Sequence, residues 1–180
     1  LLPVLMVTGA GLHDDLTASL SAGANDFLRK PYAPSELVAR VTADVDIAVI
    51  EGVMGLFDGA GHDSLEGSTA EIAAWLRAPV LLVADVYGMA RSLAAVVKGF
   101  ATFERKVRVA GIIANRCGSV RHGIMLAETL RASRLPPLAA AVPRGALPAL
   151  PERRLGLVTA DSRNLTPQAL DELAGVFEHY

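Results

Sequence analysis

The chain has 180 residues, enough for one domain with a sizeable apolar core, and its 17 basic and 19 acidic residues nearly balance. It has no long basic run, no membrane-length apolar run and no signal-peptide start, which predicts a cytoplasmic protein with no nucleic-acid or membrane partner. The single cysteine, Cys117, excludes an internal disulfide and a cysteine-built zinc site. The first residue is leucine rather than methionine, which favours a fragment, a trimmed chain or a processed product.

Apolar strand candidates alternate with amphipathic helix candidates from end to end. In chain order, the pattern predicts strand 4–8, helix 14–22, strand 26–29, helix 34–41, strand 47–50, helix 68–76, strand 79–84, helix 90–103, strand 107–114, helix 121–133, strand 138–142, a proline-rich loop at 143–152 and helix 166–178. A hydrophobic fraction of 52% with only 5% aromatic residues suits helices packed on a buried parallel sheet. We therefore expect one α/β domain over residues 1–180, a three-layer α/β/α sandwich with a mostly parallel sheet.

Residues 46–59 carry the most informative local pattern, because an apolar run ends in Glu51 and a glycine-punctuated loop then leads to Asp58. A carboxylate at the carboxyl end of a buried strand lies where open α/β sheets bind ligands. Two such carboxylates could hold Mg²⁺ through oxygen ligands. The alternative is a pair of solvated loop carboxylates. The chain contains no G-x-x-x-x-G-K-[ST] loop to cradle nucleotide phosphates, which favours weak or no metal binding.

Residues 1–43 resemble the second half of a response-regulator receiver domain. The resemblance rests on P-V-L-M-V-T at 3–8, A-G-A-N-D-F-L at 22–28 and K-P-Y at 30–32. It implies that Thr8 and Lys30 match residues that contact a phosphoryl group on an aspartate. The first half of that family, with its phosphoacceptor aspartate, is missing, so we expect no phosphotransfer. Thr8 then ends a strand, and Lys30 is solvated or ion-paired.

Residues 44–180 resemble the middle of cobyrinic acid a,c-diamide synthase. The motifs that carry this resemblance are E-G-V-M-G-L-F-D-G at 51–59, G-S-T-A-E-I-A at 67–73, P-V-L-L-V-A-D at 79–85, G-M-A-R-S-L-A-A-V-V-K-G-F at 88–100, G-I-I-A-N-R at 111–116 and P-E-R-R-L-G-L at 151–157. The resemblance implies an ATP- and Mg²⁺-dependent ligase that uses glutamine to amidate two carboxylates of a corrin precursor of cobalamin. The P-loop of that family and its glutaminase domain are missing from this sequence.

The second resemblance also implies roles for individual residues. Glu51 and Asp58 match the family's Mg²⁺-associated carboxylates, and Asn115 with Arg116 would lie near the nucleotide base. Ser68 and Thr69 precede a helix whose N–H groups could bind an anion. Local alternatives exist: Asn115 could be a turn residue, and Ser68 an ordinary helix N-cap with an acidic residue in the first turn.

The remaining reactive side chains predict no further site. Cys117 is expected to be a small strand-end residue rather than the glutaminase nucleophile. The histidines, His13, His62, His122 and His179, lack metal-ligand spacing and are expected on the surface or in loops.

Taken together, these patterns suggest a recombined hybrid of receiver-like and cobyrinate-synthetase-like parts, combining a flavodoxin-like with a P-loop-like fold. Our leading hypothesis is a folded scaffold with no catalytic activity and no tightly bound cofactor. One alternative is a fragment of an ATP- and Mg²⁺-dependent cobyrinic acid a,c-diamide synthase. A second alternative is a weak nucleotide- or anion-binding module. An exposed sheet edge could also support a homodimer.

Overall fold

The computed structural model describes residues 5–8, 26–29, 32–41, 46–52 and 54–147, together with residues 168, 171, 174 and 175. The chain divides into two compact units. Unit 1 comprises residues 1–76 with 155–161, and unit 2 comprises residues 77–154 with 162–180. Among the described residues, no helix is both long enough and apolar enough to cross a membrane.

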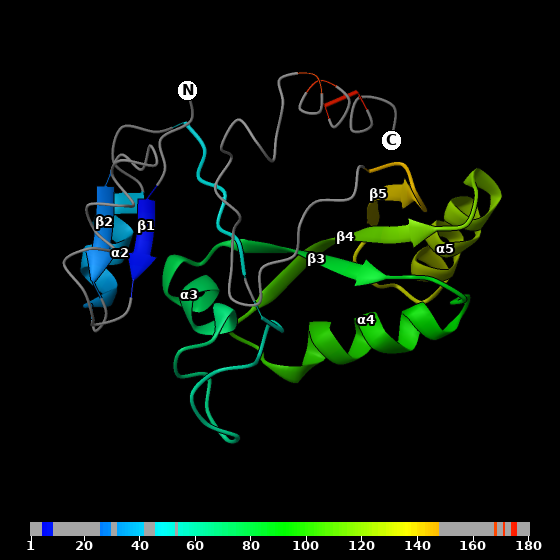
Figure 1. Ribbon diagram of the computed structural model, residues 1–180. Helices are drawn as coiled ribbons and strands as arrows, with labels where there is room; N and C mark the ends of the chain where they lie inside the picture. Colours follow the sequence, from blue (N-terminus) through cyan, green and yellow to red (C-terminus); the bar gives the residue numbers. More distant parts are fainter. Residues whose placement is uncertain are drawn as a thin grey trace. The chain divides into compact units, whose positions relative to one another are not determined.

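The described residues of unit 1 form two short parallel strands and two helices (Figure 1). These elements are β1 (Leu5–Thr8), β2 (Asp26–Arg29), α2 (Pro34–Val41) and α3 (Thr69–Leu76). β1 and β2 pair in parallel, from Leu5 opposite Asp26 to Thr8 opposite Arg29. The predicted strands and helices at these positions are therefore confirmed, with bounds that differ by at most one residue.

The helices of unit 1 pack through small and aromatic side chains. α2 contacts α3, and the rings of Tyr32 and Trp75 meet edge to face with centroids 6.3 Å apart, a favourable geometry for aromatic pairs. Ala70 and Ala73 are buried along α3. Partial burial, and secondarily the charge of Glu71, raises the pKa of the Tyr32 hydroxyl.

Residues 77–147 of unit 2 form a parallel three-stranded sheet with two connecting helices. Its elements are β3 (Pro79–Asp85), α4 (Ser92–Phe103), β4 (Arg108–Cys117), α5 (Val120–Ala132) and β5 (Leu138–Pro143). The strand order is β3-β4-β5, and both pairings are parallel. This arrangement confirms the predicted α/β class with a parallel sheet. β4 continues three residues beyond its predicted end.

The two helices of unit 2 lie side by side on the sheet: α4 contacts β4 and α5, and α5 contacts β4 and β5. The buried core includes Leu93 and Val97 of α4, Ile112 of β4, and Leu126 and Leu130 of α5, each fully or almost fully shielded from solvent. Complete burial of one such side chain stabilises a fold by about 1.5–3 kcal/mol. The apolar spacing in both helices therefore identifies the faces that meet the sheet.

The predicted strand at 47–50 is wrong. Ile47 to Ile50 have no strand conformation, and Ile47 and Val49 are 72% and 89% exposed. A strand is held by backbone hydrogen bonds to a neighbour, and none of the described sheets includes this segment. An apolar β-branched run therefore did not suffice to form a strand here.

Other predicted elements fall wholly or partly outside the described residues. The helix at 14–22 lies outside them, as does most of the helix at 166–178, although residues 168, 171, 174 and 175 are helical. Residues 144–147 form a turn after β5, in agreement with the start of the predicted loop.

Our first prediction follows from the close contact between α5 and β5. A Cβ atom at Gly123 would lie 3.1 Å from Cβ of Ala141 and 3.8 Å from Sγ of Cys117. Gly123→Val should therefore overpack this contact and lower the free energy of unfolding by about 1–3 kcal/mol. The matched control is Gly99→Val on α4, where a Cβ atom would meet nothing within 4 Å.

The control should be neutral or stabilise the chain by a few tenths of a kcal/mol, because valine has the higher helix propensity. Urea unfolding monitored by circular dichroism measures both variants. Equal stabilities of the two valine variants would contradict the packing described for α5.

Candidate functional site

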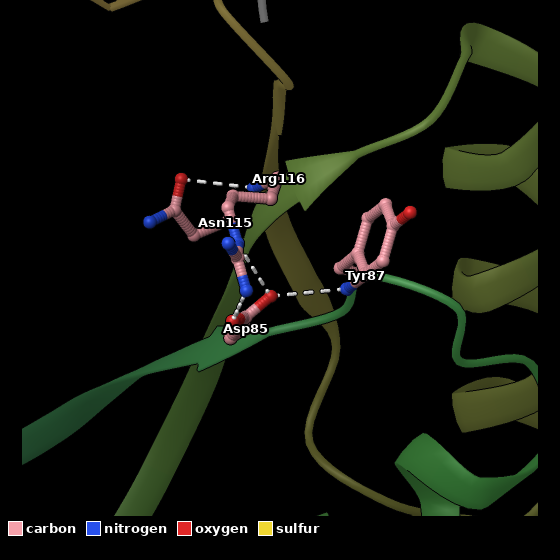
Figure 2. A network of polar contacts seen from close by, with 4 residues as sticks. All are labelled: Asp85, Tyr87, Asn115 and Arg116. Atoms are coloured by element: carbon pink, nitrogen blue, oxygen red, sulfur yellow. Dashed lines mark hydrogen bonds and ion pairs between the residues drawn. The ribbon is translucent and has the colours of Figure 1, made fainter. Parts of the chain in front are cut away.

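The carboxyl ends of β3 and β4 bring polar side chains together at one edge of the sheet. Asp85 is the last residue of β3 and stands directly opposite Asn115 in the parallel register. Arg116 follows on β4, and Tyr87 lies just beyond β3 (Figure 2). In open α/β sheets this edge is where ligands bind.

Asp85 and Arg116 form a forked ion pair. Arg116 Nε donates to Asp85 Oδ1 at 3.0 Å, and Arg116 Nη2 donates to Asp85 Oδ2. The backbone N–H of Tyr87 also donates to Asp85 Oδ1, at 3.0 Å. Two-point contacts of this kind fix geometry as well as charge.

Both partners titrate away from their ordinary ranges because of this contact. The hydrogen bonds from Arg116 and then from the Tyr87 N–H hold the pKa of Asp85 below its usual value. The hydrogen bond to Asp85 raises the pKa of Arg116. Both side chains are about half exposed, at 51% and 54%, so solvent screens the pair and its contribution to stability is small.

β4 carries an extra residue at this point. Ala114 pairs with Ala141 and Cys117 with Pro143, so three steps along β4 match two along β5. Within this irregular stretch Arg116 has φ +57°. This left-handed conformation costs a non-glycine residue about 1–3 kcal/mol. The N–H of Arg116 consequently turns toward its own neighbour and donates to Asn115 Oδ1 at 2.9 Å.

An exposed aromatic ring lies beside two guanidinium groups at the same edge. Cζ of Arg116 is 5.5 Å from the ring centroid of Tyr87, and Cζ of Arg144 is 5.0 Å from it. Tyr87 is 60% exposed. A flat ring with adjacent positive charge can stack on a planar ligand and attract an anionic one.

In unit 1, a glycine-rich loop packs against the start of α3. A Cβ atom at Gly52 would lie 2.7 Å from Oγ1 and Cγ2 of Thr69, and one at Gly59 would collide with the backbone of Glu66. Ala70 N–H donates to Leu56 O at 2.9 Å and ties the loop to the helix. Side chains at the two glycine positions would prevent this close approach.

The loop leaves both predicted metal-associated carboxylates, Glu51 and Asp58, exposed to solvent. Among the described residues, no group of three or more His, Cys, Asp or Glu side chains could hold a metal ion. Mg²⁺ is commonly bound by one or two carboxylates together with phosphate oxygens and water. As oxygen donors, Glu51 and Asp58 are chemically compatible with Mg²⁺ that carries phosphate ligands.

Ser68 caps α3. Its Oγ accepts a hydrogen bond from the N–H of Glu71 at 3.2 Å and donates to Leu65 O at 2.6 Å. The carboxylate of Glu71 accepts from the N–H of Gly67 at 2.9 Å, in the manner of a capping box. The hydroxyl of Ser68 is thus occupied within the protein, as the N-cap alternative predicts, and Thr69 lies against Gly52.

Cys117 is a buried residue at the end of β4, as predicted for a small strand-end side chain. His122 lies in α5 rather than in a loop, half-buried, with Nε2 2.6 Å from the backbone oxygen of Met89. A carbonyl can only accept, so Nε2 carries the proton. His62 is an exposed loop residue, as expected.

Several expectations lie outside the described residues: His13, His179, Lys30 and the side chain of Thr8. Three residues of the site, Asp85, Tyr87 and Arg144, were not predicted from the sequence. Only Asp85 had a usable signal, because a carboxylate directly follows the apolar run at 79–84.

The amino-acid sequence matches a known protein family over most of its length. The model of an AAA domain family matches residues 20–149. The chain belongs to this AAA-domain family. No solved structure matches the chain.

The curated relatives are named cobyrinate or hydrogenobyrinate a,c-diamide synthases. The cobyrinate a,c-diamide synthase of Syntrophotalea carbinolica is 61% identical over 140 residues, 78% of this chain and 30% of the relative. The hydrogenobyrinate a,c-diamide synthase of Mycobacterium tuberculosis is 50% identical over 128 residues, 69% of this chain and 28% of the relative. That of Mesorhizobium japonicum is 38% identical over 169 residues, 93% of this chain and 38% of the relative. The chain thus spans about a third of the length of these relatives.

These findings support the predicted resemblance to cobyrinic acid a,c-diamide synthase. They give no support to a receiver-like segment at 1–43 or to a hybrid origin. The family match begins at residue 20, and the Mesorhizobium relative aligns with 93% of this chain.

Our second prediction concerns the cap of α3. Ser68→Ala removes the hydroxyl that accepts the Glu71 N–H and should lower the free energy of unfolding by about 1 kcal/mol. The matched control is Ser92→Ala, an exposed serine at the start of α4, which should change it by less than about 0.5 kcal/mol. Urea unfolding that shows equal losses for both variants would rule out the capping role.

The third prediction concerns the pH dependence of the Asp85–Arg116 pair. Because folding lowers the pKa of Asp85, the stability it contributes is present above the unfolded pKa and is lost as the pH falls through the folded value. The urea midpoint of the unaltered chain should therefore exceed that of Asp85→Asn at pH 7. The difference should shrink between about pH 5 and pH 2.

Arg116→Gln removes the partner that lowers the pKa of Asp85. Its urea midpoint should also lie below that of the unaltered chain at pH 7 and approach it at low pH. A midpoint difference that stays constant across the whole pH range would show that the ion pair does not control the titration of Asp85.

Proposed function

We propose that this chain is the nucleotide-binding part of an ATP- and Mg²⁺-dependent cobyrinate a,c-diamide synthase. The observation that carries the proposal is a polar network at the carboxyl edge of β3 and β4. It occurs in a chain 61% identical to a cobyrinate a,c-diamide synthase over 140 residues. Such an enzyme uses ATP to activate a carboxylate of the corrin precursor for amidation.

Asn115 is suited to contact the nucleotide base. Its Oδ1 accepts the N–H of Arg116 and retains a second lone pair, while its NH₂ group has two donors. The edge of adenine presents an amino donor beside a ring-nitrogen acceptor, which an asparagine amide can match at two points. The exposed ring of Tyr87 supplies a flat surface at the same edge.

Within unit 1, Glu51 and Asp58 are suited to bind Mg²⁺ that arrives with phosphate ligands. Both are exposed oxygen donors on one glycine-rich loop, which matches the ligand preference of Mg²⁺. When bound there, the cation would neutralise charge on the phosphates. Ser68 supports the site indirectly in this scheme, because its hydroxyl caps α3.

A scaffold without catalytic activity is the competing proposal. The chain contains no G-x-x-x-x-G-K-[ST] sequence, so the groups that cradle nucleotide phosphates are not supplied by that motif in these 180 residues. We therefore expect the isolated chain to bind Mg-ATP with only about millimolar affinity. In a longer enzyme, Glu51 and Asp58 would bind Mg²⁺ under the first proposal and would have no catalytic role under the second.

The fourth prediction separates these proposals by a graft. Residues 46–147 of this chain replace the matching segment of the Syntrophotalea carbinolica synthase, and ATP-dependent amidation of cobyrinate with glutamine is measured. Activity should survive the graft. Glu51→Gln within it should lower kcat/KM by about a hundredfold or more, because a ligand of a charge-stabilising cation is lost.

The matched control is Glu66→Gln, an exposed glutamate in the same loop region, which should leave kcat/KM unchanged. A graft that folds but is inactive would support the scaffold. Equal activity of the Glu51→Gln and Glu66→Gln grafts would remove Glu51 from the metal site.

A further inference from the structure

Asp85 stands where a ligand-binding carboxylate is expected, yet both of its oxygens accept hydrogen bonds from the protein. Oδ1 accepts from Arg116 Nε and from the Tyr87 N–H, both at 3.0 Å, and Oδ2 accepts from Arg116 Nη2. A carboxylate held in this way is poorly placed to coordinate a metal ion or to accept a proton from a substrate. Its contacts instead lead to Asn115.

A short chain of contacts joins the two residues. Asp85 holds the guanidinium of Arg116, and the backbone of Arg116 has φ +57°. That left-handed backbone directs the N–H of Arg116 to Asn115 Oδ1 at 2.9 Å. A residue with a side chain favours negative φ, so the side-chain anchor of Arg116 helps to hold the conformation that orients Asn115.

The orientation of an asparagine amide decides which base it can recognise. Turning the amide by half a rotation exchanges its acceptor and its donors. In Figure 2 the Oδ1 of Asn115 faces the N–H of Arg116, and its NH₂ group points away. A half rotation would place NH₂ against N–H, donor against donor. The contact with Arg116 therefore permits one orientation only.

We propose that Asp85 is a positioning residue that acts through Arg116 to fix the amide of Asn115, and so sets a preference for adenine over hypoxanthine. This inference rests on the proposed nucleotide function. Adenine offers an amino donor at position 6 and an acceptor at position 1, whereas hypoxanthine reverses both. A fixed amide suits one of these patterns, while a free amide can turn to match either.

The test measures Kd for ATP and for ITP with the full 180-residue chain, by NMR titration in the millimolar range with Mg²⁺ present. ATP should bind the unaltered chain about tenfold more tightly than ITP, the scale of one lost hydrogen bond. In Asp85→Asn the ratio should fall to about one, mainly through tighter ITP binding, because the freed amide can turn to match hypoxanthine. The exposed carboxylate of Asp63 provides the control, and Asp63→Asn should keep the tenfold ratio.

A double-mutant cycle tests whether Asp85 acts through Asn115. Asn115→Ala alone should abolish the preference, and Asp85→Asn added to it should have no further effect on the ratio. A tenfold preference that survives in Asp85→Asn would overturn the inference. So would an additive effect of the two substitutions on the ratio.

A measurement without nucleotide tests the positioning role of Asp85 separately from the proposed nucleotide function. In Asp85→Asn, the side-chain amide resonances of Asn115 should shift and the backbone amide of Arg116 should exchange faster with solvent. Unchanged resonances and exchange would overturn the positioning role whatever binds. If neither ATP nor ITP binds the unaltered chain, the proposed function and the base preference fail, and the amide signals still decide the positioning.

Discussion

All strands of a parallel sheet end at the same edge, and in this protein the pairing of β3 with β4 sets Asp85 opposite Asn115. The side chains at that edge depend on the pairing. The forked contact to Arg116 spans 31 residues of sequence and exists because the two strands run side by side in this register. α4 and α5 reinforce the pairing from one face, with fully buried Leu93 and Leu126. Packing of the helices thus holds the polar edge in place.

Unit 1 shows a different way to hold polar residues. The described residues between Glu51 and Gly59 form no strand pairs. The Ala70 N–H and glycines that permit close approach hold this loop against the start of α3. Ser68 and Glu71 cap the first turn of the helix. Backbone contacts hold this loop while its two carboxylates remain in solvent.

Much of the fold could be predicted from sequence, because apolar periodicity and helix-start signals are local. The helices at 34–41 and 121–133 and the strand at 26–29 were placed to within a residue or two. The strand at 47–50 was wrong, since its apolar run could not reveal whether a neighbouring strand would pair with it. Bounds were least accurate at β4, where an irregular extension follows the predicted end.

The candidate site was predictable only in part. Asn115 and Arg116 were singled out by resemblance, but their contact with Asp85 depends on strand register, which periodicity does not report. The left-handed conformation of Arg116 has no sequence signal either, because arginine is not a residue that favours it. Tyr87 and Arg144 lie near one another only after β3, β4 and β5 have assembled. Tertiary contacts thus supplied what local sequence patterns could not.

The central claim is that the carboxyl edge of β3 and β4 receives a nucleotide base. Photolabelling with 8-azido-ATP and Mg²⁺, followed by tryptic peptide mapping, tests this claim most directly. The account predicts label on the peptide that contains Tyr87 or on the one that contains Asn115, and loss of that label when excess ATP is present. Label confined to other peptides, or label that excess ATP does not displace, would contradict it.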